Sequence, residues 1–199
     1  MSYNITFEKD KLNIIPFTNF LNDIFGTLVK SFVLKDFEIE LQLYKNHLIS
    51  TLNILKYSSL FLYRILIDIS IVDRPQKKYR FFIFYQLLSD IYTNRCRILT
   101  QTDDSISSIF KIYPNACWAE REAWDMFGVF FNSNYDLRRL LTDYGFEDFP
   151  LQKTFKLTGN YEVVYNETVK RVVYQNITIS QKYREFTFSN PWGNPNNKE

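Results

Sequence analysis

The 199-residue chain has only two cysteines, Cys96 and Cys117, and a single histidine, His47. An iron–sulfur cluster usually needs four cysteine ligands and a structural zinc needs four Cys or His ligands, so this chain can supply neither alone. A Ser–His or Cys–His catalytic pair would have to use His47, and no nucleophile motif lies near it. We therefore expect no catalytic residue, no metal site and no bound cofactor. We expect two buried thiols and a half-exposed histidine.

Glycines and long apolar runs are also scarce. The five glycines never cluster, which excludes a GxGxxG dinucleotide site and a P-loop. The apolar stretch around residues 60–72 is interrupted by Arg64 and Asp68, and no run reaches the roughly 20 residues that cross a membrane. The formal net charge of +2 creates no long-range field that would attract nucleic acid. We expect neither a direct membrane span nor a nucleic-acid partner.

The apolar residues that are present follow regular spacings. Helical spacing predicts one helix over residues 17–32 and a second over residues 47–56. Alternation predicts half-buried strands over residues 37–43 and 61–72, the latter with isoleucines at odd positions on one face. Residues 79–88 are apolar on both faces, which indicates an interior strand, and residues 95–100 form a shorter strand. A last helix is predicted from Ser105 to Pro114.

This order of elements predicts an α+β fold, a mostly antiparallel sheet backed by helices, over residues 1–130. From residue 150 onward helical periodicity is lost, and short β-like pieces follow at residues 161–165, 169–174, 177–179 and 186–188. An extended segment rich in Tyr, Val and Phe is an aggregation hazard in water, so we expect a partner to cover it. Residues 131–199 are therefore interpreted as a joint segment followed by an extended C-terminal arm that packs on a partner subunit.

Two stretches carry a family resemblance. Residues 120–129 read EREAWDMFGV and residues 136–146 read DLRRLLTDYGF. Both are similar to the thirty-kilodalton subunit of respiratory complex I, the NuoC-type subunit, also called NADH dehydrogenase subunit nine. The tail continues the likeness with YEVVY at 161–165, KRVVY at 170–174 and YREFTFSNPW at 183–192. Asn134, Tyr135 and residues 148–154 depart from the family pattern, which affects the detailed contacts of that turn.

The resemblance implies a core subunit of the peripheral arm of NADH:ubiquinone oxidoreductase. It implies a place beside the forty-nine-kilodalton quinone-module subunit, over which the tail wraps, and beside other peripheral-arm subunits. The complex uses FMN, iron–sulfur clusters and ubiquinone to pass electrons from NADH and pumps protons, whereas this chain is expected to hold none of these groups. Residues 1–10 include Glu8 and Asp10 and no arginine, unlike a transit peptide. We expect an organelle-encoded protein on the matrix side of the mitochondrial inner membrane, with the cytoplasmic side of a bacterial membrane as the alternative.

Structural or interface roles are assigned to ten side chains of the joint and arm: Glu120, Arg121, Glu122, Asp125, Arg138, Arg139, Asp143, Tyr144, Phe186 and Trp192. Glu120 and Glu122 invite an interpretation as a catalytic carboxylate pair. Two positions on a helix are about 200° apart, so these groups face opposite ways and cannot share a proton.

The arginines offer pairing partners. Arg121 and Asp125 are four positions apart, at the spacing of a helical ion pair. Guanidinium forks also suit a phosphate or a quinone headgroup. We favour a structural interpretation in which one of Arg138 and Arg139 pairs inside, with Asp125 or Asp143, and the other reaches a partner subunit.

Two functions of other classes stay open. The first is a related membrane-bound hydrogenase-type oxidoreductase that reuses this subunit, which its accompanying subunits would distinguish. The second is a standalone enzyme that uses Glu122, Asp125 and Arg138, which predicts a cleft enclosing these three groups.

Overall fold

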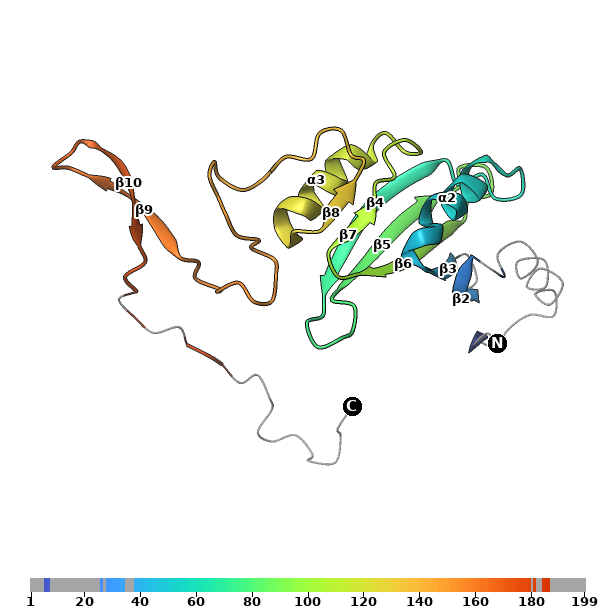
Figure 1. Ribbon diagram of the computed structural model, residues 1–199, viewed down its shortest axis with the longest axis horizontal. Helices are drawn as coiled ribbons and strands as arrows, with labels where there is room; N and C mark the ends of the chain where they lie inside the picture. Colours follow the sequence, from blue (N-terminus) through green and yellow to red (C-terminus); the bar gives the residue numbers. More distant parts are fainter. Residues whose placement is uncertain are drawn as a thin grey trace, which may run out of the picture. The chain divides into compact units, whose positions relative to one another are not determined.

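The structure is a computed structural model, and it describes residues 6–7, 26, 28–34, 38–179, 181 and 184–186. The chain divides into two units, residues 1–156 and residues 157–199 (Figure 1). None of the helices in the described residues is long and apolar enough to cross a bilayer.

The first unit is built on a six-stranded sheet with strand order β1-β2-β3-β6-β5-β4. Its strands are β1 (Thr6–Phe7), β2 (Val29–Leu34), β3 (Glu38–Leu43), β4 (Ile65–Asp73), β5 (Phe81–Leu88) and β6 (Arg95–Thr102). The pairs β2–β3, β4–β5 and β5–β6 are antiparallel, whereas β1–β2 and β3–β6 are parallel. The predicted α+β class with a mostly antiparallel sheet is therefore confirmed.

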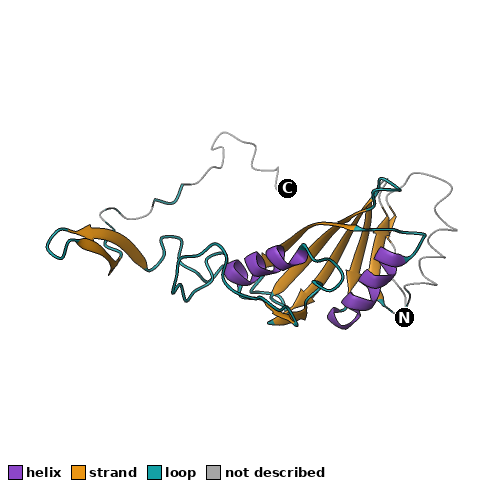
Figure 2. Ribbon diagram, turned by 90° about the horizontal axis from the view of Figure 1, so that it is seen from above, coloured by secondary structure: helices purple, strands orange, loops and turns teal. Residues whose placement is uncertain are grey.

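Two helices, α2 (Leu48–Tyr57) and α3 (Ala116–Phe127), lie against the same face of this sheet (Figure 2). A short 3-10 turn, η1 (Lys45–His47), precedes α2. Leu48, Leu52 and Leu55 of α2 are buried because they recur at helical spacing, and they join one core with the inward side chains of the strands, such as Ile83. A second, two-stranded parallel sheet pairs β7 (Ser105–Ser107) with β8 (Phe130–Asn132), which precede and follow α3 in the chain.

Several predicted elements are confirmed. Residues 37–43 correspond to β3, whose side chains alternate between half-buried and buried, and residues 47–56 correspond to α2. Residues 79–88 correspond to β5, which lies between β6 and β4 as an interior strand. The strand predicted at residues 95–100 is β6, which extends to Thr102. His47 is half-buried, and Cys96 and Cys117 are buried free thiols.

The helix predicted over residues 17–32 is wrong at its C-terminal end. Val29 and Phe32 lie on β2, and residues 17–25 fall outside the described part of the chain. The pairing of β2 with β3 shifts register between Val29 and Ser31. An extra residue at such a bulge leaves two side chains three positions apart on the same face, which is the spacing expected of a helix.

The same effect changes the face of β4. A register shift between Leu66 and Asp68 reverses the alternation, so Leu66, Ile69 and Ile71 are buried. Ile65 and Ile67 are exposed, although the sequence pattern placed all four odd-numbered isoleucines on one apolar face. A bulge moves the side chains that follow it to the other face of the strand.

The helix predicted over residues 105–114 is also wrong. Residues 105–107 form β7, turns follow, and the helix α3 begins at Ala116, just after Pro114. Long-range contacts override the local helical spacing here, because the backbone N–H of Ser108 donates to the carbonyl of Asn132 (2.9 Å). Proline lies near the start of the real helix, where its missing N–H costs little.

The second unit contains a β-hairpin of β9 (Tyr161–Asn166) and β10 (Arg171–Asn176). These strands confirm the β-like pieces predicted at residues 161–165 and 169–174. Residues 177–179 are not a strand. Phe186 is described without regular structure, and residues 187–188 lie outside the described residues.

Candidate functional site

The helix α3 carries most of the EREAWDMFGV stretch, and the chain that follows β8 folds back on it. We call residues 133–156 the joint loop. The start of α3 is tied to the sheet because the Asn115 side-chain amide donates to the carbonyl of Leu66 (2.9 Å). Its end is set by Gly128, which adopts a left-handed conformation (φ 78°) and donates its N–H to the carbonyl of Trp124.

Glu120 is completely buried and links the residues that follow β7 to the residues that follow β8. Its carboxylate accepts hydrogen bonds from the Ser108 hydroxyl (2.6 Å), the Ile109 backbone N–H (2.8 Å) and the Asn134 amide (2.7 Å). Burial raises the pKa of Glu120 above its usual value, while these three donors partly oppose the shift. The carboxylate therefore connects α3 to the residues before it and to the first turn of the joint loop.

Asp125 is completely buried and organises the next part of the joint loop. It accepts hydrogen bonds from the backbone N–H groups of Leu140 (3.2 Å), Leu141 (2.7 Å) and Thr142 (2.8 Å), and from the Thr142 hydroxyl (2.6 Å). Arg139 adds an ion pair at 3.0 Å. Burial by itself would raise the pKa of Asp125, but the bonds from Thr142, Leu141 and Arg139 outweigh it and hold the pKa at about 2. The side chain is therefore an anion at neutral pH, and it fixes the backbone of residues 139–142.

The three arginines of the motifs have different surroundings. Arg139 is partly buried and binds Asp125 and the carbonyl of Asp148 (2.9 Å). Arg138 is 72% exposed and pairs with Asp136 at 3.0 Å. Arg121 is buried; its ion-pair partner is Asp136 (3.9 Å) rather than Asp125, and its Nε donates to the carbonyl of Arg138.

Aromatic side chains and two hydrogen bonds to backbone carbonyls close the joint loop onto the end of α3. The ring of Phe149 packs edge to face on Trp124, with ring centroids 5.4 Å apart. A Cβ atom added to Gly128 would lie 2.7 Å from that Phe149 ring, so glycine is required at this position for close approach as well as for its φ angle. The N–H of Leu151 donates to the carbonyl of Met126 (3.0 Å), and the Gln152 amide donates to the carbonyl of Phe127.

A further ion pair, which sequence reasoning missed, ties the joint loop to the sheet. Arg80 binds the buried carboxylate of Asp73 through two nitrogens, at 2.8 and 2.9 Å, and the backbone N–H of Lys153 donates to the same carboxylate (2.8 Å). The hydrogen bond from Arg80 lowers the pKa of Asp73, and burial partly opposes this. The sequence did contain a signal for the Asp73–Arg80 pair. Asp73 follows the strand predicted at residues 61–72, and Arg80 lies at the start of the next predicted strand, so opposite charges face each other across the turn. Nothing local signals Lys153.

The remaining sequence-predicted residues lie outside this network. Glu122 is exposed on α3, Tyr144 is fully exposed, and Asp143 is an exposed residue whose carboxylate accepts from the Tyr144 N–H. Phe186 is 67% exposed, and Trp192 lies outside the described residues. The joint loop also exposes Leu141 (61%) and Leu151 (54%).

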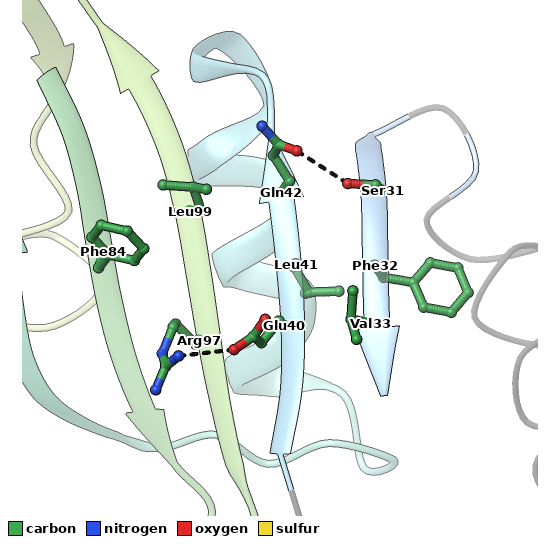
Figure 3. Close-up of a pocket in the computed structure, with 9 residues that line it drawn as sticks. All are labelled: Ser31, Phe32, Val33, Glu40, Leu41, Gln42, Phe84, Arg97 and Leu99. Atoms are coloured by element: carbon green, nitrogen blue, oxygen red, sulfur yellow. Dashed lines mark hydrogen bonds and ion pairs between the residues drawn. The ribbon is translucent and has the colours of Figure 1, made fainter. Parts of the chain in front are cut away.

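The acidic and basic side chains that could form an acid–base set are kept apart or are engaged within the chain. Glu120 and Glu122 face opposite ways, Asp125 is saturated with donors, and Arg138 pairs at the surface. A pocket of about 190 Å³ lies elsewhere, on the strands β2, β3, β5 and β6. Figure 3 shows that its polar side chains bind each other, Arg97 to Glu40 (2.8 Å) and Ser31 to Gln42 (3.1 Å). The geometry favours a structural role for the joint loop.

The chain was compared with known proteins. The family model described as the 30 kDa subunit of respiratory-chain NADH dehydrogenase matches residues 41–161, more than half of the chain. This chain belongs to that family. The match begins within β3 and runs through β4, β5, β6, α3 and the joint loop, so the carboxylate-bearing helix described above lies inside the region that defines the 30 kDa family.

Individual relatives support the assignment. NADH dehydrogenase (ubiquinone) iron-sulfur protein 3 of Patellifolia webbiana is 46% identical over 77% of this chain and 81% of its own length. NADH-ubiquinone oxidoreductase subunit 9 of Acanthamoeba castellanii is 49% identical over 69% and 71%. A bacterial relative, from the NADH-quinone oxidoreductase of Hyphomonas neptunium, is 40% identical over 82% of each chain.

The fold also matches a chain in a solved respiratory assembly. A chain in the structure of the membrane-bound sulfane sulfur reductase, an archaeal respiratory membrane complex, superposes with a TM-score of 0.61. The match covers 71% of this chain and 86% of that one at 20% identity, so it supports the fold alone.

Proposed function

We propose that this 30 kDa-family chain is a non-catalytic subunit of the peripheral arm of an NADH:ubiquinone oxidoreductase, where it holds the quinone module in place. The observation that carries the proposal is the hairpin of β9 and β10. Tyr161, Val163 and Tyr165 alternate along β9, and the register places Val172 and Tyr174 opposite them on the same side. All five are between 55% and 67% exposed.

The other side of this hairpin is more polar. Glu162 faces Gln175, with a 2.8 Å hydrogen bond between their side chains, and Asn166 faces Arg171, while one apolar pair, Val164 and Val173, lies between them. An isolated two-stranded hairpin is marginally stable in water. Burial of its apolar side supplies about 25 cal/mol per Å², offset in part by the cost of ordering the segment. The arm therefore gains most by binding to another protein.

We infer that this protein is the forty-nine-kilodalton quinone-module subunit, with other peripheral-arm subunits nearby. Residues 1–130 act as the α+β domain, and residues 131–199 act as joint and arm. The exposed Leu141, Tyr144 and Leu151 of the joint loop give the first unit apolar contact residues of its own. The backbone of Leu141 is held by Asp125 and that of Leu151 by the end of α3, so little conformational entropy is lost when these two residues bind.

We also propose that the chain carries no cofactor and that FMN, iron–sulfur clusters and ubiquinone belong to other subunits. Relatives bear the name iron-sulfur protein, but the donors here do not fit a cluster. The chain has two cysteines, Cys96 on β6 and Cys117 on α3, where four thiolates are usual. Coupled proton pumping is then a property of the assembly. The proposed location is the matrix side of the mitochondrial inner membrane.

The test is incorporation of hairpin variants into the complex. Val172→Ser with Tyr174→Ser removes apolar surface from the apolar side, and Glu162→Ser with Gln175→Ser changes the more polar side by the same number of positions. The complex is isolated in mild detergent, its subunits are identified by mass, and the amount of this chain is measured. We expect the first variant to be recovered at least about tenfold less than wild type. The second should be recovered at a near-normal level.

Equal recovery of both variants would show that the hairpin is not the binding surface. Co-purification with hydrogenase subunits in place of NADH-oxidising ones would identify a different complex. Stoichiometric iron in the isolated, folded chain would contradict the proposed absence of a cluster.

A further inference from the structure

The turn between β4 and β5 carries the densest positive charge in the described part of the chain. Residues 74–80, which we call the basic turn, contain Arg74, Lys77, Lys78 and Arg80 and no acidic residue. Arg80 is bound to Asp73, whereas Arg74, Lys77 and Lys78 are exposed. The whole chain has a formal net charge of only +2, so this turn is a local excess.

The basic turn is held in one conformation. The Arg74 N–H donates to the carbonyl of Arg80 (2.8 Å), and the Lys77 N–H donates to the carbonyl of Arg74 (3.0 Å). The two-point ion pair between Arg80 and Asp73 closes its base. The guanidinium of Arg74 lies 4.9 Å from the centre of the Phe82 ring, which restricts that side chain further. The backbone that carries these cations is therefore held in one conformation by hydrogen bonds.

The same ion pair brings a fourth exposed cation, Lys153, beside the turn. The backbone of Lys153 binds the Asp73 carboxylate at 2.8 Å, and Arg80 also contacts Gln152 (3.3 Å). Lys153 is exposed. Among the described residues, no carboxylate lies within ion-pair distance of Lys153 or of the three exposed cations of the turn. The chain's own carboxylates beside the turn are Asp73, which binds Arg80 and the backbone of Lys153, and Asp103, which accepts from the Arg80 N–H (3.0 Å). The four exposed cations keep their outward charge available to negative groups of another molecule.

We propose that the basic turn and Lys153 form a docking surface for an acidic segment of a neighbouring subunit. The inference rests on the proposed function for the existence of that neighbour. Charge complementarity selects the chemistry, because fixed ammonium and guanidinium groups recognise carboxylates. The occupant is a protein because the basic surface adjoins the joint loop, which is proposed to contact other subunits. Lys153 belongs to that loop, and the exposed Leu151 is two residues away. An anionic membrane surface is the competing occupant that the experiment must exclude.

The experiment uses the intact complex purified in detergent. A water-soluble carbodiimide joins a lysine amine to a carboxylate that touches it, and peptide mass spectrometry identifies both residues. We expect links from Lys77, Lys78 or Lys153 to Asp or Glu of another subunit. We also expect acetic anhydride to label Lys77 and Lys78 at least about tenfold more slowly in the complex than in the isolated chain, because the acidic segment covers them.

Charge reversal supplies an independent measurement. Lys77→Glu with Lys78→Glu should lower recovery in the complex about tenfold, because like charges then face each other, whereas Lys77→Arg with Lys78→Arg should be recovered normally. Lys45→Glu with Lys111→Glu changes the net charge by the same amount at exposed sites elsewhere and should have little effect.

Asp103 lies beside the basic turn, because its carboxylate accepts from the Arg80 N–H (3.0 Å), and Asp104 follows it in the chain. Links confined to these two residues of this chain, with unprotected lysines in the complex, would overturn the proposal. So would protection that appears only when the complex is placed in vesicles containing anionic lipid, because the occupant is then a membrane surface. Absence of the wild-type chain from any NADH-oxidising complex would refute the proposed function instead, which keeps the two failures distinguishable.

Discussion

The joint loop and the hairpin are both segments without a hydrophobic core of their own, yet they are held in different ways. In the joint loop, buried carboxylates replace a core: Asp125 accepts five hydrogen bonds from residues 139–142, and Asp73 binds the backbone of Lys153. The hairpin has its own ladder of backbone bonds and a cross-strand pair between Glu162 and Gln175. Its apolar side is exposed.

The joint loop should therefore matter for the stability of the folded chain, and the hairpin for its assembly into the complex. A buried anion that satisfies several backbone donors specifies one conformation, and removal of that anion leaves all of them unpaired. An exposed apolar side contributes little to the folded chain alone and much to a complex. Substitutions in the joint loop should therefore change the free energy of unfolding, whereas substitutions on the hairpin should change recovery in the complex.

The largest effect is expected for Asp125→Ala. This change removes the carboxylate partner of Arg139 and leaves three backbone N–H groups without their acceptor in a buried site. Loss of one partner from a buried ion pair typically costs about 3–5 kcal/mol. Urea denaturation of the full chain measures this loss, with Glu122→Ala as the control because that carboxylate is exposed on the same helix. Similar unfolding free energies for both variants would show that Asp125 does not hold the loop.

Gly128→Ala should have the next largest effect. Its φ of 78° is unfavourable for alanine, and the new Cβ would lie 2.7 Å from the Phe149 ring. Together these effects are expected to cost about 2–3 kcal/mol. Gly145→Ala is the matched control, since it also has a positive φ (74°) but has no atom within 4 Å of the added Cβ. A smaller loss for Gly145→Ala isolates the contribution of the Phe149 contact.

The two buried carboxylates should respond to pH in opposite ways. The pKa of Asp125 is lowered from 3.8 to about 2, so its stabilisation is present above about pH 4 and is lost as the pH falls towards 2. Linkage converts this shift to about 2 kcal/mol. The pKa of Glu120 is raised from 4.5, so its contribution is present below that pH and declines as the pH rises through the raised value.

Urea denaturation between pH 2 and 7 measures both trends. Asp125→Asn should lack the acid loss that wild type shows below pH 4. Glu120→Gln should lack the decline above pH 4.5. Parallel pH profiles for wild type and Asp125→Asn would contradict the role assigned to this carboxylate.

The core strands could be predicted because their alternation is a local property of the sequence. The pattern of β3 and the two apolar faces of β5 follow directly from neighbouring residues. The bulges could not be predicted. In β2 and in β4, one extra residue places side chains three positions apart on the same face, as with Leu66 and Ile69. Local spacing alone cannot distinguish this pattern from a helix.

In the candidate site, too, features set by neighbouring residues could be predicted, and contacts between residues far apart in the sequence could not. The opposite orientation of Glu120 and Glu122 follows from helix geometry, and an internal role for one of the two joint-loop arginines follows from charge chemistry. The partners of the carboxylates are set by tertiary structure. Lys153 lies 80 positions from Asp73, and Thr142 lies 17 from Asp125, so no local pattern connects them.

The smallest effect on stability is expected for Arg138→Ala, next to the internal Arg139. Arg138 is 72% exposed and its bond to Asp136 is a surface ion pair, which is worth less than about 1 kcal/mol. If Arg138 reaches a partner subunit, its loss lowers the abundance of the complex while the activity per assembled complex stays normal. Quantitative native electrophoresis with an NADH oxidation assay measures both quantities, and Lys45→Ala is an exposed control. A large loss of specific activity at normal abundance would instead indicate a direct role in quinone or proton chemistry.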